Sequence, residues 1–383
     1  MTFDFVVIGA TGEQGSIASR DLLEAGYRVL LCGRRPRTIK KFLKNKCARF
    51  ATVDLRNIAA TAKIIRASGS AIVLNCAELT WNCHAMESCL RANAHYLDLG
   101  GLHEMTKKQF AFDARFRRKK LTALLGCGST PGIANVMVAY AVMDFDLVDH
   151  IDLGFAWDSN MKTFVLPYSF ESIIHELTVP AIVLENGRFE EVQACSLEGM
   201  TSFLGVGRQS LYCIVHSEVF TFHRYFVSKG LKSVHYKAGF PLHSYTVIKT
   251  LLDLGFASKE PLCLSGSKII PLDWTSDVLR RIPRSKQYKE TEDIWAKIYG
   301  TSQGKPKRVE MDCLVKTTPG WGSAGSNVDT GRTAAVMAAM LHRGEITMTG
   351  VTAPEECVPS EIFFRELYKR GMRVYKNGKP IHI

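Results

Sequence analysis

Three glycines near the start of the chain have the spacing of a turn that binds a dinucleotide. Gly9, Gly12 and Gly15 follow an apolar stretch that ends at Ile8, and residues 16–23 continue with helical spacing. Gly9 allows a tight turn, Gly12 lets backbone N–H groups approach a pyrophosphate, and Gly15 lets the helix pack against the strand. The positive end of that helix then faces the phosphates. We expect cofactor contacts along the whole turn, from Gly9, Thr11, Gly12, Glu13, Gln14 and Gly15.

Two arginines at the end of the next predicted strand bear on the choice of cofactor. This strand covers residues 27–32 and is followed by Gly33, Arg34 and Arg35. An NAD-selective site has an acidic residue about 20 residues past the glycines, which binds the ribose 2′-hydroxyl. Guanidinium groups suit a 2′-phosphate instead and can stack on adenine. The two arginines therefore favour NADP, with NAD as the alternative, although they also fit a solvated basic loop.

Further polar and small residues follow other predicted strands. Asp54 and Leu55 stand after the third strand, where Asp54 can contact the adenine edge or cap the next helix. Three later loops also follow buried strands, and the carboxyl ends of parallel strands meet at the edge where such sheets bind ligands. We take as cofactor contacts Asn75, Cys76, Ala77, Gly100 and Cys127, and as substrate contacts Gly101, Pro131 and Asn135. Each residue alone also fits a turn or cap, but three such loops in succession favour a site.

Composition excludes several classes of protein. The formal net charge is +12, but the basic residues are dispersed and lack the interleaved aromatic residues of a nucleic-acid groove. The eleven cysteines form no Cys-x-x-Cys pair, which predicts a reducing compartment and no metal centre. A strand is predicted from residue 3, so we expect no signal peptide, and the apolar stretch 131–143 is too short to span a membrane. We expect a soluble, cytoplasmic protein with a small-molecule substrate and no nucleic-acid or membrane partner.

The order of predicted elements indicates an α/β fold in two domains. Residues 1–130 alternate buried strands with amphipathic helices, which predicts a Rossmann-type, doubly wound parallel sheet. Residues 131–324 contain strands joined by turns, including a hairpin loop at 299–305, and predict an inserted α+β domain with a mostly antiparallel sheet. The alanine-rich helix at 331–343 begins a return, so that residues 325–383 complete the first domain.

The chain resembles the saccharopine dehydrogenase superfamily, in particular its lysine 6-dehydrogenase branch. The resemblance covers most of the chain and rests on several segments that are specific in combination. These segments are 9–15 (GATGEQG), 96–101 (YLDLGG), 126–135 (GCGSTPGIAN), 168–171 (YSFE), 179–181, 185–187, 216–217, 236–237 with His243, 344–346 and 354–356.

The resemblance implies hydride transfer between a nicotinamide and a carbon bonded to nitrogen, in an amino-acid-like substrate such as lysine or saccharopine. Asp98 lies nearest the expected nicotinamide end, and we assign it to iminium stabilisation or proton handling. From the inserted domain, Glu171, His216 and His243 are catalytic candidates, with Glu176 one helical turn on as a rival to Glu171. Both histidines also fit a satisfied core position. Arg224 can bind a substrate carboxylate or lie on the surface.

Two departures from that family leave the substrate open. Arg34 and Arg35 replace the acid of the NAD-dependent lysine 6-dehydrogenase branch, and Thr130 stands where saccharopine reductases carry an Asp. The leading hypothesis is an NADP-dependent oxidoreductase, with a homodimer formed through the inserted sheet. The alternatives are a carboxynorspermidine-type polyamine dehydrogenase, whose pocket needs acids to hold a diamine, and a non-catalytic NADP-binding or scaffold protein.

Overall fold

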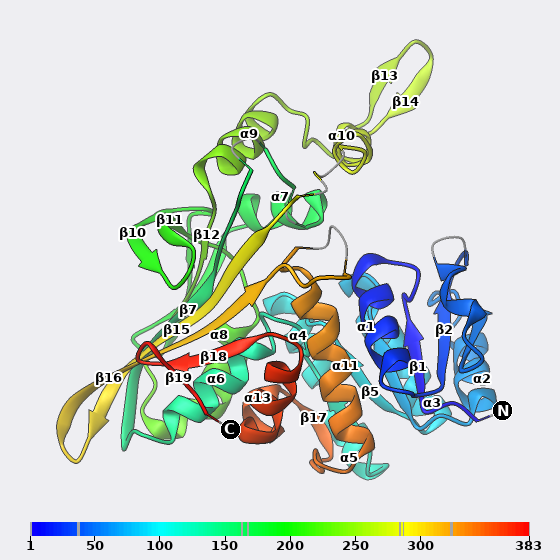
Figure 1. Cartoon of the computed structure of the whole chain (residues 1–383), viewed down its shortest axis with the longest axis horizontal. Helices are drawn as coiled ribbons and strands as arrows, with labels where there is room; N and C mark the ends of the chain where they lie inside the picture. The colour runs from blue at the N-terminus through cyan, green and yellow to red at the C-terminus, as the bar shows by residue number, and fades with distance from the viewer. Residues whose placement is uncertain are drawn as a thin grey trace.

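The computed structural model describes residues 2–36, 39–161, 164–166, 168–282, 285, 287–321 and 325–382, and only the backbone of Leu197. Within these residues the chain forms two large sheets and a small two-stranded one (Figure 1). Buried residues of both large sheets belong to one core. No helix of the described chain has both the length and the apolar character needed to cross a membrane.

The first sheet has seven parallel strands in the order β17-β6-β5-β4-β1-β2-β3. Crossover helices cover both faces, so its strands are apolar on both sides. Its strands are β1 (Phe5–Ile8), β2 (Val29–Gly33), β3 (Ala48–Thr52), β4 (Ile72–Asn75), β5 (His95–Asp98), β6 (Thr122–Leu124) and β17 (Gly350–Thr352). Helices α1 (Glu13–Glu24) and α11 (Val328–His342) cover one face, and α2 (Ile58–Ser68), α3 (Asn82–Ala92), α4 (His103–Phe110) and α5 (Asp113–Arg118) the other. The predicted Rossmann-type sheet is confirmed.

The second sheet has ten strands and is mostly antiparallel, as predicted. The long strands β7 (Leu147–Ser159), β15 (Glu290–Ser302) and β16 (Lys305–Lys316) lie at its centre, and the predicted hairpin joins β15 to β16. One pair, β7 with β12 (Ser233–Gly239), is parallel. The other strands are β8 (Ala181–Glu185), β9 (Arg188–Val192), β10 (Leu197–Phe203), β11 (Gly207–Cys213), β18 (Arg373–Lys376) and β19 (Lys379–Pro380).

The end of the chain differs from the expectation in one respect. β17 completes the first sheet, as predicted, but β18 pairs with β16 and belongs to the second sheet. Because the last segment crosses back, the C-terminal region ties the two sheets together. In this region, α12 (Pro354–Cys357) and α13 (Ser360–Lys369) pack against α6 (Ile133–Val142).

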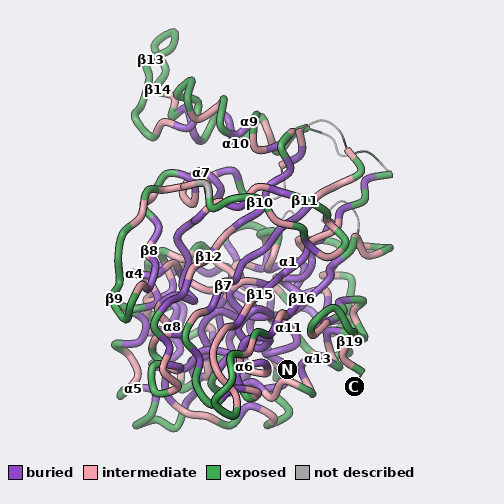
Figure 2. Tube along the Cα trace, turned by 90° about the vertical axis from the view of Figure 1, so that its left-hand side faces the viewer, coloured by how far each residue is buried: buried purple, intermediate pink, exposed green. Residues whose placement is uncertain are grey.

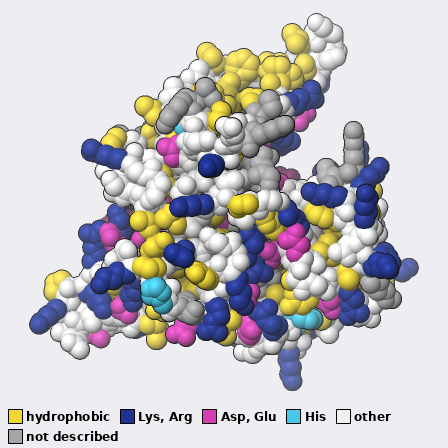
Figure 3. All heavy atoms as spheres, viewed as in Figure 1, with side chains coloured by type: hydrophobic (Ala, Val, Ile, Leu, Met, Phe, Trp, Pro, Cys, Tyr) yellow, Lys and Arg dark blue, Asp and Glu magenta, His cyan; other side chains and the backbone are white. Residues whose placement is uncertain are grey.

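The remaining helices lie on the second domain. They are α7 (Phe170–Thr178), α8 (Glu218–Phe226), α9 (Leu242–Asp253) and α10 (Pro271–Leu279). α10 follows the small hairpin of β13 (Leu262–Leu264) and β14 (Ser267–Ile269), which projects from the body of the molecule (Figure 1). Figure 2 shows that this projection is exposed, whereas most of β7, β12 and β15 is buried or partly buried, and Figure 3 shows Lys and Arg side chains dispersed over the visible face.

Candidate active site

A groove of about 370 Å³ lies at the carboxyl ends of β1, β2 and β3. Gly9 has φ +75° there, and a Cβ atom on it would lie 2.6 Å from the Cys76 and Ala77 backbone. A Cβ atom on Gly15 would lie 2.2 Å from the Gly9 carbonyl oxygen. Gly12 caps α1 without a side-chain hydrogen bond, which leaves the first N–H groups of the helix directed at the groove. The glycines therefore do what their spacing predicts, and the residues present fit a dinucleotide.

The basic end of the groove differs in detail from the prediction. Arg34 and Arg35 are both exposed, but only Arg34 lines the groove. A second guanidinium comes from Arg56, which forms a bidentate contact with Asp54, Nη2 to Oδ2 at 2.5 Å and Nε to Oδ1 at 3.0 Å. This partner lowers the pKa of Asp54 to about 2. Asp54 does not cap the following helix, α2. Asn57 caps it, because its Oδ1 accepts a hydrogen bond from the Ala60 N–H.

A second cavity, of about 390 Å³, adjoins this groove, because Cys76, Ala77 and Glu78 line both. It lies between the first sheet and the second, with Glu13 and Gln14 of α1 on one side and β7, β15 and α7 on the other. Leu55 lines only the groove, together with Thr11. The arrangement places a substrate-sized space directly beyond the dinucleotide turn.

The second cavity is acidic. Six carboxylates from five segments of the chain line it, and none of its described lining residues is a lysine or an arginine. Aromatic rings of Phe155, Trp157 and Tyr168 form part of the wall. Carboxylates and aromatic faces together suit a cationic ligand. The six acids are Glu13 on α1, Glu78 after β4, Glu176 on α7, Glu290 and Glu292 on β15, and Asp329 on α11.

Neighbouring donors hold these acids in place. Glu290 Oε1 accepts from the Ser326 N–H at 3.0 Å and from its hydroxyl, and Oε2 accepts from the Tyr288 hydroxyl. Tyr168 donates to Glu176 Oε2 at 2.5 Å. Burial raises the pKa of Glu176 and of Asp329 to about 7, and it raises the pKa of Glu292 as well. A cation that entered the cavity would therefore favour the ionised forms.

His216 lines the same cavity and has a defined orientation. Its Nδ1 atom donates to Glu218 Oε2 at 2.5 Å, and its ring stacks on Tyr236 at a centroid distance of 3.8 Å. Tyr236 in turn donates to Thr130 Oγ1 at 2.7 Å, and Thr130 also lines the cavity. Burial alone would lower the pKa of His216, but the Glu218 carboxylate outweighs it and the pKa is raised. In its protonated form the imidazole also carries a proton on Nε2, which it can donate.

Asp98, the first catalytic candidate, lies elsewhere. Its side chain is buried and accepts four hydrogen bonds, at Oδ1 from the Gly100 and Gly126 N–H groups and at Oδ2 from Tyr96 and Gln109, over 2.6–2.9 Å. Asp98 lines neither the groove nor the cavity. Its lone pairs are occupied, so we reassign it from proton handling to fixing the loops after β5 and β6.

Three other candidates from the second domain, Glu171, Arg224 and His243, do not line the cavity. Glu171 accepts from Ser169, Ser276 and Arg280 and ties α7 to α10 outside the cavity, so its rival Glu176 is the residue at the site. The Arg224 guanidinium lies 4.7 Å from the centre of the Phe110 ring and is not part of the cavity wall. His243, at the start of α9, does not line the cavity either. No cation from these candidates is available for a substrate carboxylate.

Several predicted contacts are structural instead. Asn75 donates to Asn82 and Tyr96 beneath the loop after β4, and Cys127 is fully buried. Asn135 donates to Glu355 and accepts from the Gly132 N–H. Gly100, Pro131 and Asn135 border a separate interior void of only about 10 Å³. Gly101 packs on Met105. These residues shape the loops beside the site.

Comparison with known proteins agrees with the fold. Residues 5–124 match the family model of the saccharopine dehydrogenase NADP binding domain, and residues 128–372 match the saccharopine dehydrogenase C-terminal domain. The chain therefore belongs to the saccharopine dehydrogenase family.

Several curated proteins and solved structures are similar to this chain. A carboxyaminopropylagmatine dehydrogenase from Synechocystis sp. is 24% identical over 96% of each chain, and a carboxynorspermidine synthase from Vibrio cholerae is 25% identical over 77% of this chain and 73% of the relative. The apo saccharopine dehydrogenase (L-Glu forming) of Saccharomyces cerevisiae has a TM-score of 0.73 at 12% identity, over 99% of this chain and 100% of that one. The homospermidine synthase of Legionella pneumophila, in complex with NAD, has a TM-score of 0.69 at 11% identity, over 99% and 92%. The protein is an oxidoreductase with an NADP-binding domain.

Proposed function

We propose that this protein is an NADP-dependent oxidoreductase that reduces an imine formed between a polyamine-like amine and an aldehyde, giving a secondary amine. The single observation that carries the proposal is the cavity beside the dinucleotide turn, which is lined by six acids and by no described lysine or arginine. The substrate then has two cationic groups. One is the iminium at the reacting carbon, and the other is a distal amine or guanidinium that lies among the carboxylates. Saccharopine carries several carboxylates, and this wall would repel them.

We assign two roles to the residues of the cavity, which are binding of the distal cation and donation of a proton. Glu176, Glu292 and Asp329 bind the distal cation, and the face of Trp157 provides a further attraction for it. Gly9, Gly12 and Arg34 of the adjoining groove would hold NADPH, which would supply the hydride. The Nε2–H of His216 donates a proton to the substrate nitrogen, and Glu218 stabilises the imidazolium before the transfer. The imine thus gains a hydride at carbon and a proton at nitrogen, and the reverse reaction returns both.

Relatives support the same substrate class. Their names describe carboxyaminopropyl and carboxynorspermidine products. A carboxyaminopropyl group on an amine corresponds to reductive coupling of that amine with aspartate semialdehyde. Neutral donors in the cavity, from Ser129 and Asn327, suit the carboxylate of such an aldehyde. Agmatine and putrescine are the amines to test first.

An absorbance assay of NADPH oxidation tests the proposal. We expect turnover with aspartate semialdehyde plus agmatine or putrescine, and little or none with lysine plus an α-keto acid. Glu176→Gln should lose most of this activity, whereas Glu171→Gln, on the same helix but outside the cavity, should retain it. Faster turnover with the lysine pair, or equal activity of the two variants, would contradict the proposal.

A further inference from the structure

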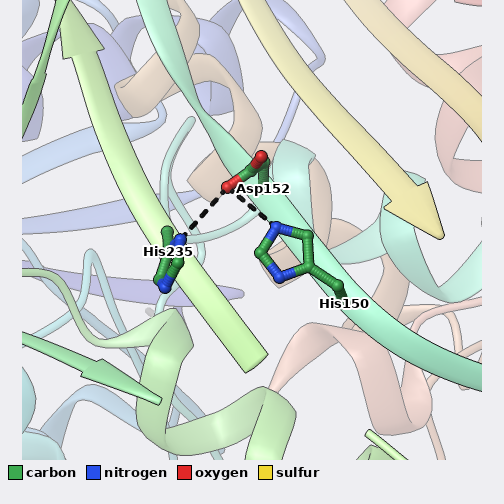
Figure 4. A group of neighbouring side chains, drawn as sticks. All are labelled: His150, Asp152 and His235. Carbon is green, nitrogen blue, oxygen red and sulfur yellow. Dashed lines mark ion pairs between the residues drawn. The ribbon is translucent and has the colours of Figure 1, made fainter. Parts of the chain in front are cut away.

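A group of metal-ligand residues lies on the second sheet, away from the cavity. His150 and Asp152 are two residues apart on β7 and therefore point to the same face. His235 on β12 is the direct register partner of Asp152. Figure 4 shows the three side chains converging on one point. Phe155 and Trp157 of the same strand face the cavity, so the group occupies the opposite face.

The distances suit a tetrahedral zinc site. His150 Nε2 lies 3.2 Å from Asp152 Oδ1, and His235 Nδ1 lies 3.5 Å from the same oxygen. With metal–ligand bonds of about 2.0–2.1 Å, tetrahedral geometry separates two ligand atoms by roughly 3.3 Å. The three ligand atoms all lie within 4.8 Å of one another. Two imidazole nitrogens and one carboxylate oxygen form a donor set that zinc accepts.

A second carboxylate orients one of the ligands. Glu185 on β8 lies with Oε2 2.9 Å from His235 Nε2, on the opposite side of the ring from Asp152. Its other oxygen accepts from Ser233 Oγ at 3.3 Å. A carboxylate that holds one ring nitrogen leaves the other to bind a metal, which is the usual arrangement around histidine ligands. This contact is independent of the three ligands themselves.

The local charge also fits a divalent cation. Asp152, Glu185 and Glu198 face a single ammonium, because Lys237 Nζ lies 2.8 Å from Asp152 and 3.9 Å from Glu198. Three carboxylates against one ammonium leave two negative charges when the histidines are neutral. Lys237 competes with a metal for Asp152, and it can move toward Glu198 when one binds.

We propose that His150, Asp152 and His235 form a zinc-binding site that joins β7 to β12, with Glu185 positioning His235. Solvent completes the coordination, since the three side chains retain between 18% and 25% of their exposure. The site is separate from the reaction at the cavity and stabilises the second sheet.

Calorimetric titration of the full-length, chelator-treated protein with ZnCl₂ tests this site. We expect one zinc per chain, an affinity at least about 100-fold lower in His150→Gln and in Asp152→Asn, and one about 10-fold lower in Glu185→Gln. Lys237→Gln should bind zinc more tightly, because it removes the competing ammonium. Cobalt bound in place of zinc should show the visible absorption of tetrahedral coordination.

Two controls make the outcome decisive. His382→Gln, at the exposed C-terminal end, should leave the affinity unchanged. Each ligand variant should still bind NADPH, which shows that it is folded. If folded His150→Gln and Asp152→Asn bind zinc as the parent protein does, or if the parent binds none, the site does not exist and the group is an internal ion-pair network.

Discussion

The groove and the cavity meet at Cys76, Ala77 and Glu78, yet they are built in opposite ways. The groove, for which we propose an anionic ligand, combines the glycine turn after β1 with Arg34 and Arg56, and its lining comes from the ends of β1, β2 and the segments that follow β3 and β4. The cavity, for which we propose a cationic ligand, is lined by carboxylates from five segments spread along the chain between Glu13 and Asp329. A local unit can be recognised from spacing, whereas a site assembled from distant segments depends on the tertiary fold.

The largest expected effect concerns the proton donor of the cavity. His216→Asn should lower kcat/KM for the amine–aldehyde pair by about 10²–10⁴-fold, because the general acid is lost. NADPH affinity should be unchanged, since His216 lines only the cavity. Steady-state kinetics with a cofactor titration measure both quantities, and a weaker NADPH affinity with normal kcat would oppose the assignment.

The pH profile sharpens this assignment. Because the pKa of His216 is raised, its protonated form is present at low pH and is lost as pH rises through that pKa. Glu176 and Asp329, with pKa values of about 7, must ionise to bind a cation. We expect a bell-shaped profile of kcat/KM for imine reduction. His216→Asn should lack the alkaline limb, and a profile with that limb intact would contradict the role.

Carboxylate variants test the cationic specificity of the cavity. Glu292→Gln should reduce kcat/KM for agmatine by about 10- to 100-fold, the effect of losing one charged hydrogen bond of about 1.5–3 kcal/mol. Glu171→Gln is the matched control outside the cavity and should stay within about threefold. Kinetics with saturating NADPH measure this difference, and equal losses in both variants would indicate a structural effect.

Arginine variants test the anionic specificity of the groove. Arg34→Ala should weaken NADPH binding by about 10-fold and leave NADH binding nearly unchanged, because only NADPH carries the 2′-phosphate. Arg35→Ala should affect neither, since Arg35 does not line the groove. Fluorescence titration with both coenzymes distinguishes these cases. A loss confined to Arg35→Ala would reverse the assignment.

Asp98→Asn should have the smallest effect on catalysis. An amide cannot accept at both oxygens, so two of the four donors lose their partner and the free energy of unfolding falls by about 1–3 kcal/mol. The kcat of the folded variant should stay close to that of the parent. Thermal unfolding and kinetics measure the two effects, and a stable but inactive variant would restore the catalytic role.

The sequence predicts the first sheet, the turn at Gly9 to Gly15 and the class of cofactor, because each depends on local spacing. It also places His216 and Glu176 among the candidates. The sequence does not point to Glu292 and Asp329, since nothing local brings β15 to α11. The one signal for an acidic site is the spacing of Glu290 and Glu292, which places both on the same face of a strand. Asp98 was misjudged because its four donors come from β5, α4 and two loops.

The central claim is that the carboxylates hold a second cationic group of the amine. Comparing kcat/KM for agmatine with that for butylamine, in the parent protein and in Glu292→Gln, measures that contribution directly. We predict a preference for agmatine of about 100-fold in the parent that falls to about 10-fold or less in the variant, as expected for one lost charged contact. An equal preference in both proteins, or a parent that favours butylamine, would contradict the account.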